Sequence, residues 1–443
     1  MGTAALTLSG ARSHAQANPK RNVLLYVVDD QGHGDAGCYG NPAIRTPGLD
    51  TLAKEGTRMN YAYCTTPSCS ASRSVLLTGL YNHANGQYGH AHDYHHFVSF
   101  PKIKTLPVLL GDAGYRTLCA GKYHVAPEEV YHFQQYNPVR APDEMAEQCR
   151  DFIAAESEQP FFLYFCTVEP HRPFKREGSD TFSPDDVIVP PFLPDIPECR
   201  EELAQYYGSV QRADRGLARL IEILKETGRW EDTLVIFLSD NGIAFPGAKT
   251  NVYEPGIRLP CVVRNPLQEV EGKACDAMVN WADITPTILD YAGVQAPDTT
   301  FHGRSFLDAL PEERPEGWDE TYASHTFHEI TMYYPNRVIV ERQYKLIWNI
   351  AHGLSFPFAS DLWEAATWQA VLDRNLTHYG KRTVDAYLHR PEFELYDLKV
   401  DPDEVNNLAD DPNHADELKR LQQKLRDFQK RTNDPWILKW EHE

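Results

Sequence analysis

Two apolar stretches of the sequence end in side chains that could bind a metal ion. One stretch ends in Asp29 and Asp30, and the other ends in Asp240 and Asn241. Carboxylate and amide oxygens are hard ligands, which suit Ca²⁺, and with less preference Mg²⁺, better than zinc. An Asp-Asp pair can also cap a turn, but that alternative does not explain the matching Asp-Asn pair at the second stretch.

Five basic side chains could converge on the same metal ion. They are Arg73, Lys122, His124, His171 and Lys249. A divalent ion beside several cations forms a pocket for a tetrahedral oxyanion such as phosphate or sulfate. The chain has 18 histidines, most of which must be structural. Only histidines that end apolar stretches are therefore given a role.

Cys69 stands between two serines, four residues before Arg73 and just ahead of an apolar run. A helix that begins here would direct its first N–H groups and the positive end of its dipole at an anion. A thiolate in that place could be a nucleophile. The alternative is an inert cysteine at the start of a helix.

The segments that carry these residues alternate between strand and helix patterns. Continuous apolar runs, typical of buried strands, occupy 21–30, 115–124, 160–171 and 233–242. Helical patterns between them occupy 49–56, 105–114 and 201–228. This alternation predicts a mainly parallel sheet covered by helices on both faces. Because ligands of such sheets bind beyond the carboxyl ends of the strands, four polar strand ends predict one shared site.

The pattern changes in the C-terminal part of the chain. Residues 338–349 and 393–409 predict antiparallel strands with turns, and 416–432 predicts a charged amphipathic helix. We therefore expect a catalytic domain over residues 21–320 and a smaller α+β domain over residues 321–443.

Composition limits the classes of partner. The net charge of −20 argues against general binding to nucleic acid or an anionic membrane, and no apolar run approaches the ~20 residues of a membrane span. The nine cysteines include no CxxC pair. We expect residues 1–20, which end near Ala15-Gln16-Ala17, to be a truncated export signal or a disordered tail. A signal implies a periplasmic or secreted protein, and its absence a cytoplasmic one.

The stretch CSASRSVLLTG, residues 69–79, resembles the signature of the sulfatase family, in which the cysteine is oxidised after translation to formylglycine. The hydrated aldehyde is then the nucleophile. By this resemblance Cys69 is a precursor, and a formylglycine-generating maturation enzyme is a partner. Ala71 stands where proline is commoner, which leaves open the maturation system that acts.

The resemblance extends over nearly the whole chain after residue 20. Two stretches, HDYHHF at 92–97 and HEITMYYPNR at 328–337, resemble the branch of the family that removes N-sulfate from glucosamine. Lys249 departs from that branch, where arginine is expected. The family implies an α/β, alkaline-phosphatase-like fold with a mainly parallel sheet between helices and a smaller C-terminal α+β domain.

The resemblance also implies roles for the candidate residues. The implied calcium ligands are Asp29, Asp30, Asp240, Asn241 and matured Cys69. Arg73 and Lys122 would hold and polarise the hydrated aldehyde. His171 would protonate the leaving group, and Lys249 would contact a sulfate oxygen. His124 would take a proton from the second hydroxyl and so release sulfate.

Residues of the two branch-specific stretches are candidates for binding the sugar. They are Asp93, His96, His328, Glu329 and Arg337. The alternative for each is packing between domains. The acidic net charge fits a pocket for one chain-end sugar better than a groove for a long polyanion. We therefore predict removal of N-sulfate from a terminal glucosamine.

Three other functions compete with this prediction. An exo-acting O-sulfatase on a carbohydrate sulfate ester fits the same residues. An alkaline-phosphatase-type phosphoesterase would need a second, histidine-rich metal set, which the sequence does not reveal. A catalytically inactive glycan-binding protein would not need the full set of charged residues. The oligomeric state stays open, with a homodimer as one alternative.

Overall fold

The computed structural model describes residues 21–174, 182–268 and 272–442. A nine-stranded mixed sheet has the order β4-β3-β5-β1-β6-β8-β2-β7, with β9 also paired to β2. Its strands are β1 (Asn22–Val28), β2 (Thr57–Tyr63), β3 (Arg116–Gly121), β4 (Gln135–Asn137), β5 (Phe161–Cys166), β6 (Thr233–Ser239), β7 (Arg258–Leu259), β8 (Cys261–Arg264) and β9 (Lys273–Asn280). The expected signal or tail at 1–20 lies outside the described residues.

The four strands with polar ends are direct neighbours in the sheet. β3 pairs with β5, β5 with β1, and β1 with β6, all in parallel register. Every residue of β1 is buried. A strand covered on both faces reads as a continuous apolar run, which explains why the sequence pattern revealed these strands. The predicted parallel arrangement at the centre of the sheet is confirmed.

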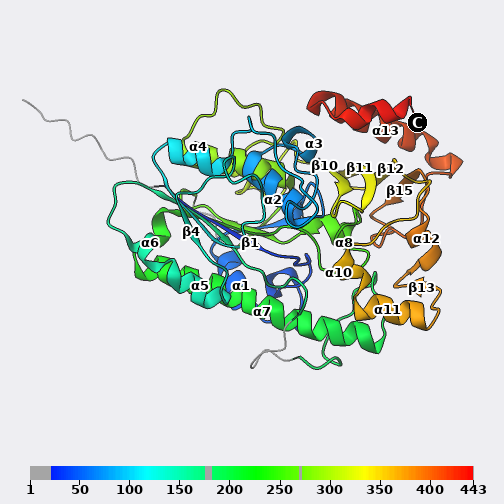
Figure 1. Ribbon diagram of the computed structural model, residues 1–443, viewed down its shortest axis with the longest axis horizontal. Coiled ribbons are helices and arrows are strands. Elements are labelled where there is room, and N and C mark those ends of the chain that lie inside the picture. Colours follow the sequence, from blue (N-terminus) through cyan, green and yellow to red (C-terminus); the bar gives the residue numbers. More distant parts are fainter. Residues whose placement is uncertain (1–20, 175–181, 269–271, 443) are drawn as a thin grey trace, which may run out of the picture.

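Helices cover both faces of the sheet (Figure 1). One layer contains α1 (Pro47–Lys54), α5 (Pro142–Gln148), α6 (Arg150–Ala154) and α7 (Pro197–Glu226), and the other contains α2 (Cys69–Thr78), α4 (Leu106–Asp112) and α9 (Ile284–Ala292). Side chains of β1 alternate between the layers: Leu24 and Tyr26 pack in one hydrophobic cluster, and Leu25 and Val27 in the other. The sheet is therefore the middle layer of three.

A second sheet follows in the C-terminal part of the chain. Its antiparallel order is β10-β11-β12-β15, with the bounds β10 (Glu320–Phe327), β11 (Tyr333–Glu341), β12 (Tyr344–Asn349) and β15 (Phe393–Asp397). The helix α13 (Ala415–Thr432) lies against it (Figure 1). The antiparallel strands with turns predicted at 338–349 are confirmed, because β11 and β12 form an antiparallel hairpin there.

The two sheets share one hydrophobic core. Leu25 of the large sheet, Ile347 of the small sheet and Phe428 of α13 belong to the same cluster of buried side chains. The smaller α+β part is thus packed onto the larger one around common apolar surface. The division at residues 320 and 321 stays a prediction, although β10 begins at Glu320.

Short elements complete the described fold. They are α3 (Asn82–Asn85), α8 (Glu254–Ile257), α10 (Ser360–Trp363), α11 (Ala366–Asp373), α12 (Val384–Leu388), β13 (His378–Tyr379) and β14 (Arg382–Thr383). Among the described residues, no helix has the length and apolar character needed to cross a membrane. The nine cysteines all lie in the described ranges, and each is a free thiol.

Candidate active site

Backbone hydrogen bonds continue the parallel pairing of the strands beyond the strand ends. The N–H of Asp29 donates to the carbonyl of Glu169 (3.2 Å), and the N–H of Asp240 donates to the carbonyl of Val28 (3.1 Å). The N–H of Lys122 bonds in the same way to the end of β5 (2.9 Å). Polar residues that follow β1, β3 and β6 therefore lie side by side at one edge of the sheet.

The carboxylates at this edge form a buried cluster. Asp29, Asp30, Asp240 and Asn241 have no exposed surface. Asn241 Nδ2 donates to Asp30 Oδ1 (2.6 Å), and the N–H of Asp30 donates to Asp240 Oδ1 (3.1 Å). Asp30 has a φ of 70°, a left-handed conformation that is costly for a residue with a side chain. The surrounding contacts hold it there.

Two oxygens of this cluster have no hydrogen-bond partner among the described residues. They are Asp29 Oδ1 and Asn241 Oδ1, and both are buried. A buried polar atom without a partner is costly, so such atoms point to a ligand. The set of carboxylate and amide oxygens fits a hard divalent cation. Cys69 adjoins the set, because its Sγ lies 3.6 Å from Asp30 Oδ1.

The electrostatics of the cluster also favour a bound cation. Burial raises the pKa of Asp240 to about 7, because Asp29 and Asp30 add to the effect and Arg73 offsets only part of it. Burial acts to raise the pKa of Asp29 too, but Lys122 and Arg73 help to hold it well below its ordinary range. A divalent ion would stabilise the ionised form of every carboxylate here.

Cys69 is the first residue of α2, and its side chain is fully buried. Burial raises the pKa of the Cys69 thiol well above its ordinary value, because Lys122 and Lys249 oppose desolvation only in part. An uncharged thiol is a poor nucleophile. A buried, uncharged thiol is poorly suited to attack, which agrees with the expected oxidation of Cys69.

Arg73 lies one turn after Cys69, so both side chains face the same side of α2. Arg73 Nε donates to Asp240 Oδ2 (2.8 Å), and its Nη2 lies 3.7 Å from Asp29 Oδ1. Lys122 Nζ binds Asp29 Oδ2 (2.5 Å). These two cations therefore border the carboxylate cluster at Asp29 and Asp240.

Lys249 connects the cluster to a more distant part of the chain. Its Nζ lies 3.1 Å from Asp30 Oδ2, 3.0 Å from His171 Nε2 and 2.8 Å from Asp361 Oδ2. Asp361 belongs to α10, outside the large sheet. Desolvation acts to lower the pKa of Lys249, but Asp30 and Asp361 raise it well above its ordinary value. Lys249 is therefore a permanent cation beside His171.

Asp361 is a site residue that sequence reasoning missed. It occurs as a single acidic residue in the stretch ASDLW, which matches no motif. Its Oδ1 atom is buried, and no residue in the described part of the chain forms a hydrogen bond with it. Burial acts to raise its pKa, but Lys249 lowers it to about 2, so the carboxylate is ionised. No local pattern could have placed it beside Lys249.

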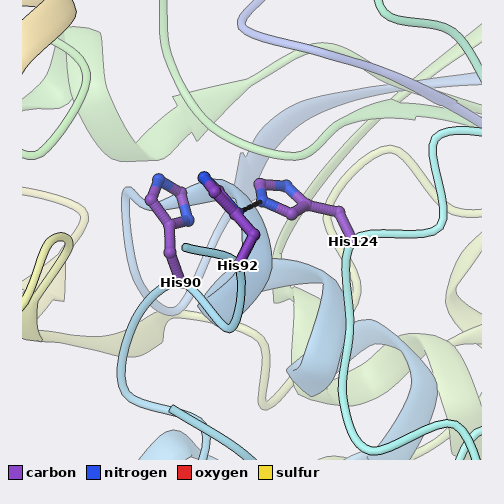
Figure 2. Close-up of side chains that lie close together, drawn as sticks. All are labelled: His90, His92 and His124. Atoms are coloured by element: carbon purple, nitrogen blue, oxygen red, sulfur yellow. Dashed lines mark hydrogen bonds between the residues drawn. The ribbon is translucent and has the colours of Figure 1, made fainter. Parts of the chain in front are cut away.

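His124 lies among other histidines at the rim of the site. Its Nε2 is 3.1 Å from His92 Nδ1, and His90 lies alongside both (Figure 2). His90 is 3.0 Å from His328 between their Nε2 atoms. The structure therefore brings together a group of histidines that the sequence did not reveal. The sequence separates His124 from the HAHDYHH stretch, and only the fold unites them.

The predicted sugar-binding residues fall into three environments. Asp93 and His96 are exposed. Glu329 accepts hydrogen bonds from the N–H and Oγ of Ser360, at the start of α10. His328 is buried and contacts Ser68 Oγ through Nδ1 (2.9 Å). The first three therefore stay candidates for contact with a sugar, while His328 lies deeper, next to α2.

Arg337 has a different environment. Its guanidinium is buried and forms two hydrogen bonds with the carboxylate of Asp434, of 2.5 Å and 2.9 Å. The ring of Trp436 lies 4.8 Å from its charged carbon. These contacts occupy the group inside the C-terminal part of the protein. We therefore interpret Arg337 as a packing residue, which is the alternative to its expected contact with sugar.

Comparison with known proteins places the chain in a family. A sequence model of the sulfatase family matches residues 21–294, and one described as N-sulphoglucosamine sulphohydrolase, C-terminal, matches residues 248–364. N-sulphoglucosamine sulphohydrolase from Homo sapiens is 38% identical over 94% of this chain and 91% of its own length. An ulvan-active sulfatase of Formosa agariphila is 29% identical over 92% and 78%. The chain belongs to the sulfatase family.

Solved structures show the same fold. A protein in complex with D-glucosamine-2-N,6-O-disulfate superposes with a TM-score of 0.75 at 20% identity, over 96% of this chain and 100% of the other. Phosphonate monoester hydrolase of Agrobacterium radiobacter superposes with a TM-score of 0.73 at 19% identity, over 94% and 96%. The expected alkaline-phosphatase-like architecture is confirmed. The fold alone does not select the substrate, because this framework carries more than one chemistry.

Proposed function

We propose that this enzyme hydrolyses the N-sulfate of a terminal glucosamine in a heparan-type saccharide, releasing sulfate and a free amine. The observation that carries the proposal is the match of residues 248–364 to the C-terminal model of N-sulphoglucosamine sulphohydrolases. This segment contains both Lys249 and Asp361. The 38% identity with the human relative over nearly the whole chain supports the same reaction.

The nucleophile in this proposal is residue 69 after oxidation of Cys69 to formylglycine. Sulfatases generally use formylglycine and a divalent metal ion. The hydrated aldehyde supplies one hydroxyl for attack and a second for release of sulfate. Arg73 and Lys122 lie where they can stabilise negative charge on residue 69. A maturation enzyme that carries out the oxidation is therefore an expected partner.

We propose Ca²⁺ as the metal ion, with Mg²⁺ as the weaker alternative. Its ligands would be Asp29, Asp30, Asp240, Asn241 and matured residue 69. The unpaired oxygens of Asp29 and Asn241 support this assignment. Ca²⁺ accepts oxygen ligands in variable numbers and geometries, whereas Mg²⁺ requires a nearly ideal octahedron of ligands. The ion would supply electrostatic stabilisation of the oxyanion.

The remaining residues manage protons and the sulfate oxygens. His171, whose Nε2 lies 3.0 Å from Lys249 Nζ, would protonate the leaving nitrogen. Lys249 would contact a sulfate oxygen, while Asp361 keeps it oriented. His124 would accept a proton from the second hydroxyl of residue 69. The proposal is supported by the chain order, because His124 follows β3, His171 follows β5 and Lys249 follows β6.

The context of the enzyme is also part of the proposal. The Ala15-Gln16-Ala17 pattern supports export to the periplasm or the medium. A homodimer is compatible with the chain, and size determination in solution would test it.

Asp93, His96 and Glu329 are proposed to contact the sugar ring, with His328 behind them.

Product analysis tests the proposed substrate. Enzyme co-expressed with a maturation enzyme should be incubated with defined glucosamine saccharides that carry N-sulfate, 6-O-sulfate or both. We expect loss of N-sulfate from the terminal sugar and a new free amine, with 6-O-sulfate retained. Efficient loss of O-sulfate with N-sulfate intact would contradict the proposal and favour an O-sulfatase. Release of phosphate from a phosphate monoester tested in parallel, with no release of sulfate from these saccharides, would favour a phosphoesterase.

A further inference from the structure

Three histidines from two separate segments meet at the rim of the site (Figure 2). The ring centroids of His90 and His92 are 4.7 Å apart, those of His90 and His124 4.9 Å, and those of His92 and His124 5.0 Å. One ring nitrogen from each histidine lies within 4.8 Å of the other two. This spacing allows a single ion to contact all three imidazoles after small side-chain rotations.

Each of the three rings has a nitrogen that a metal ion could use. Ser70 Oγ lies 3.1 Å from His90 Nδ1, so the ligand atom of His90 would be Nε2, which would exchange its 3.0 Å contact with His328 Nε2 for the ion. A hydrogen bond to one ring nitrogen commonly orients the other toward a metal. His124 Nδ1 is buried, and within the described ranges it has no hydrogen-bond partner. His92 is exposed, so its ring can turn toward an ion that arrives from solvent.

We propose that His90, His92 and His124 form a second metal site, which binds a transition-metal dication such as Zn²⁺ and thereby inhibits the enzyme. Imidazole nitrogens prefer zinc and copper, whereas the oxygens of the carboxylate cluster prefer calcium. The two sites therefore differ in the ions that they select.

The charge state of the imidazoles agrees with this site. Burial lowers the pKa of His90 and of His124 well below the ordinary value, and it also lowers the pKa of His92. Neutral imidazole is the form that binds metals, so at neutral pH zinc does not have to displace a proton from these rings. Asp93, whose carboxylate lies 3.7 Å from His92 Nε2, adds favourable charge nearby.

Inhibition rests on the proposed function, in which His124 accepts a proton. A zinc ion bound to His124 occupies the nitrogen lone pair that would otherwise accept the proton. Because general acid–base groups contribute ~10²–10⁴-fold to rates, we expect saturating zinc to lower activity at least about tenfold. A chelator that prefers zinc to calcium should restore activity while the carboxylate site keeps its ion.

The test measures zinc binding and activity on the same tag-free protein in excess calcium. Equilibrium dialysis followed by elemental analysis counts zinc per chain, and the visible absorption of bound Co²⁺ reports nitrogen ligands in low coordination. His92→Gln removes one ligand at an exposed position, and His132→Gln changes an exposed histidine outside the trio as the matched control. For each variant, activity with zinc is divided by activity of the same variant without zinc, so differences in basal activity cancel.

We expect one zinc ion per chain, a cobalt spectrum and inhibition for the wild type and for His132→Gln, with all three lost in His92→Gln. The site is contradicted if the wild type binds no zinc, or if His92→Gln binds it unchanged. Zinc binding at the trio with full activity contradicts the inhibition. A protein with no sulfatase activity contradicts the proposed function instead, and the zinc count and cobalt spectrum still decide the site.

Discussion

The Nζ atom of Lys249 lies 2.8 Å from Asp361 Oδ2, although the two residues are 112 positions apart in the chain. Lys249 is in the loop that follows β6 of the large sheet, and Asp361 is in α10 of the C-terminal part. The ion pair therefore brings a carboxylate from outside the large sheet to the proposed sulfate pocket. Lys249 therefore contacts both the edge of the large sheet, through Asp30, and the C-terminal part, through Asp361.

Removal of this carboxylate should weaken the chemical step. Asp361→Asn leaves Lys249 in contact with Asp30 and His171 but without the partner that orients it. Loss of such a supporting partner typically costs about 10- to 100-fold, so we expect that decrease in kcat/KM. Because the sulfate group is common to all substrates, an N-sulfated glucosamine and a small aryl sulfate should be affected alike.

Asp373→Asn is the matched control for this variant, since Asp373 is exposed on the following helix. Steady-state kinetics on both substrates make the comparison. Unchanged kinetics in Asp361→Asn would show that the ion pair serves only to join the two parts of the protein.

Cys69 should be modified in active enzyme. Mass spectrometry of the peptide that contains residue 69 should show an aldehyde or its hydrate in place of the thiol. Full activity with an unmodified cysteine would rule out the formylglycine mechanism. Cys69→Ala should lower kcat by at least about a thousandfold, because removal of a covalent nucleophile eliminates the main reaction path. Its melting temperature should show that the fold is retained.

Chelation should abolish activity, and calcium should restore it. Ligand binding stabilises the native state by mass action, by about 2.7 kcal/mol at a concentration 100 times Kd, so calcium should also raise the melting temperature. Asp240→Asn should reduce both responses, because it removes a proposed ligand. Elemental analysis of enzyme isolated without added zinc should find one calcium ion per chain. Two zinc ions would instead favour a phosphoesterase.

Glu329 should contribute to binding of the sugar and not to hydrolysis of the sulfate group. Glu329→Ala should lower kcat/KM for N-sulfated glucosamine about 10- to 100-fold more than for an aryl sulfate, as expected for a lost hydrogen bond from a charged group. Glu364→Gln, at an exposed position next to α10, provides the control. Equal losses on both substrates would show that Glu329 works through Ser360, by holding α10 in place.

The pair formed by Arg337 and Asp434 should make stability depend on pH. Burial acts to raise the pKa of Asp434, but Arg337 holds it well below its ordinary range. A carboxyl group whose pKa is depressed in the folded state stabilises the protein fully above its unfolded pKa of about 3.9, and this contribution is lost as the pH falls toward the folded value.

Asp434→Asn should therefore destabilise the protein by about 3–5 kcal/mol at pH 7, where it leaves Arg337 buried and unpaired. The difference in melting temperature from the wild type should shrink between pH 5 and pH 3. Asp427→Asn, exposed on α13, should show no such trend. A difference in melting temperature that stays constant with pH would mean that the charge of Asp434 does not contribute to stability.

Local patterns in the sequence were sufficient to find the central strands and their polar ends. The run of seven apolar or small polar residues in β1 is buried on both faces, and that double burial is what the pattern records. Neighbouring parallel strands end at the same edge, so Asp29, Lys122 and Asp240 were expected together and lie together. The residues that follow Cys69 formed a short motif that needs no fold to be recognised.

Contacts between distant segments required the structure. The structure joins three pairs of residues from distant segments of the chain, namely Lys249 with Asp361, His92 with His124, and Arg337 with Asp434. Strand and helix patterns report how one segment is buried, but they contain no information on which distant segment covers it. The two sheets share one hydrophobic core, and the way in which they pack around it decides which polar side chains meet.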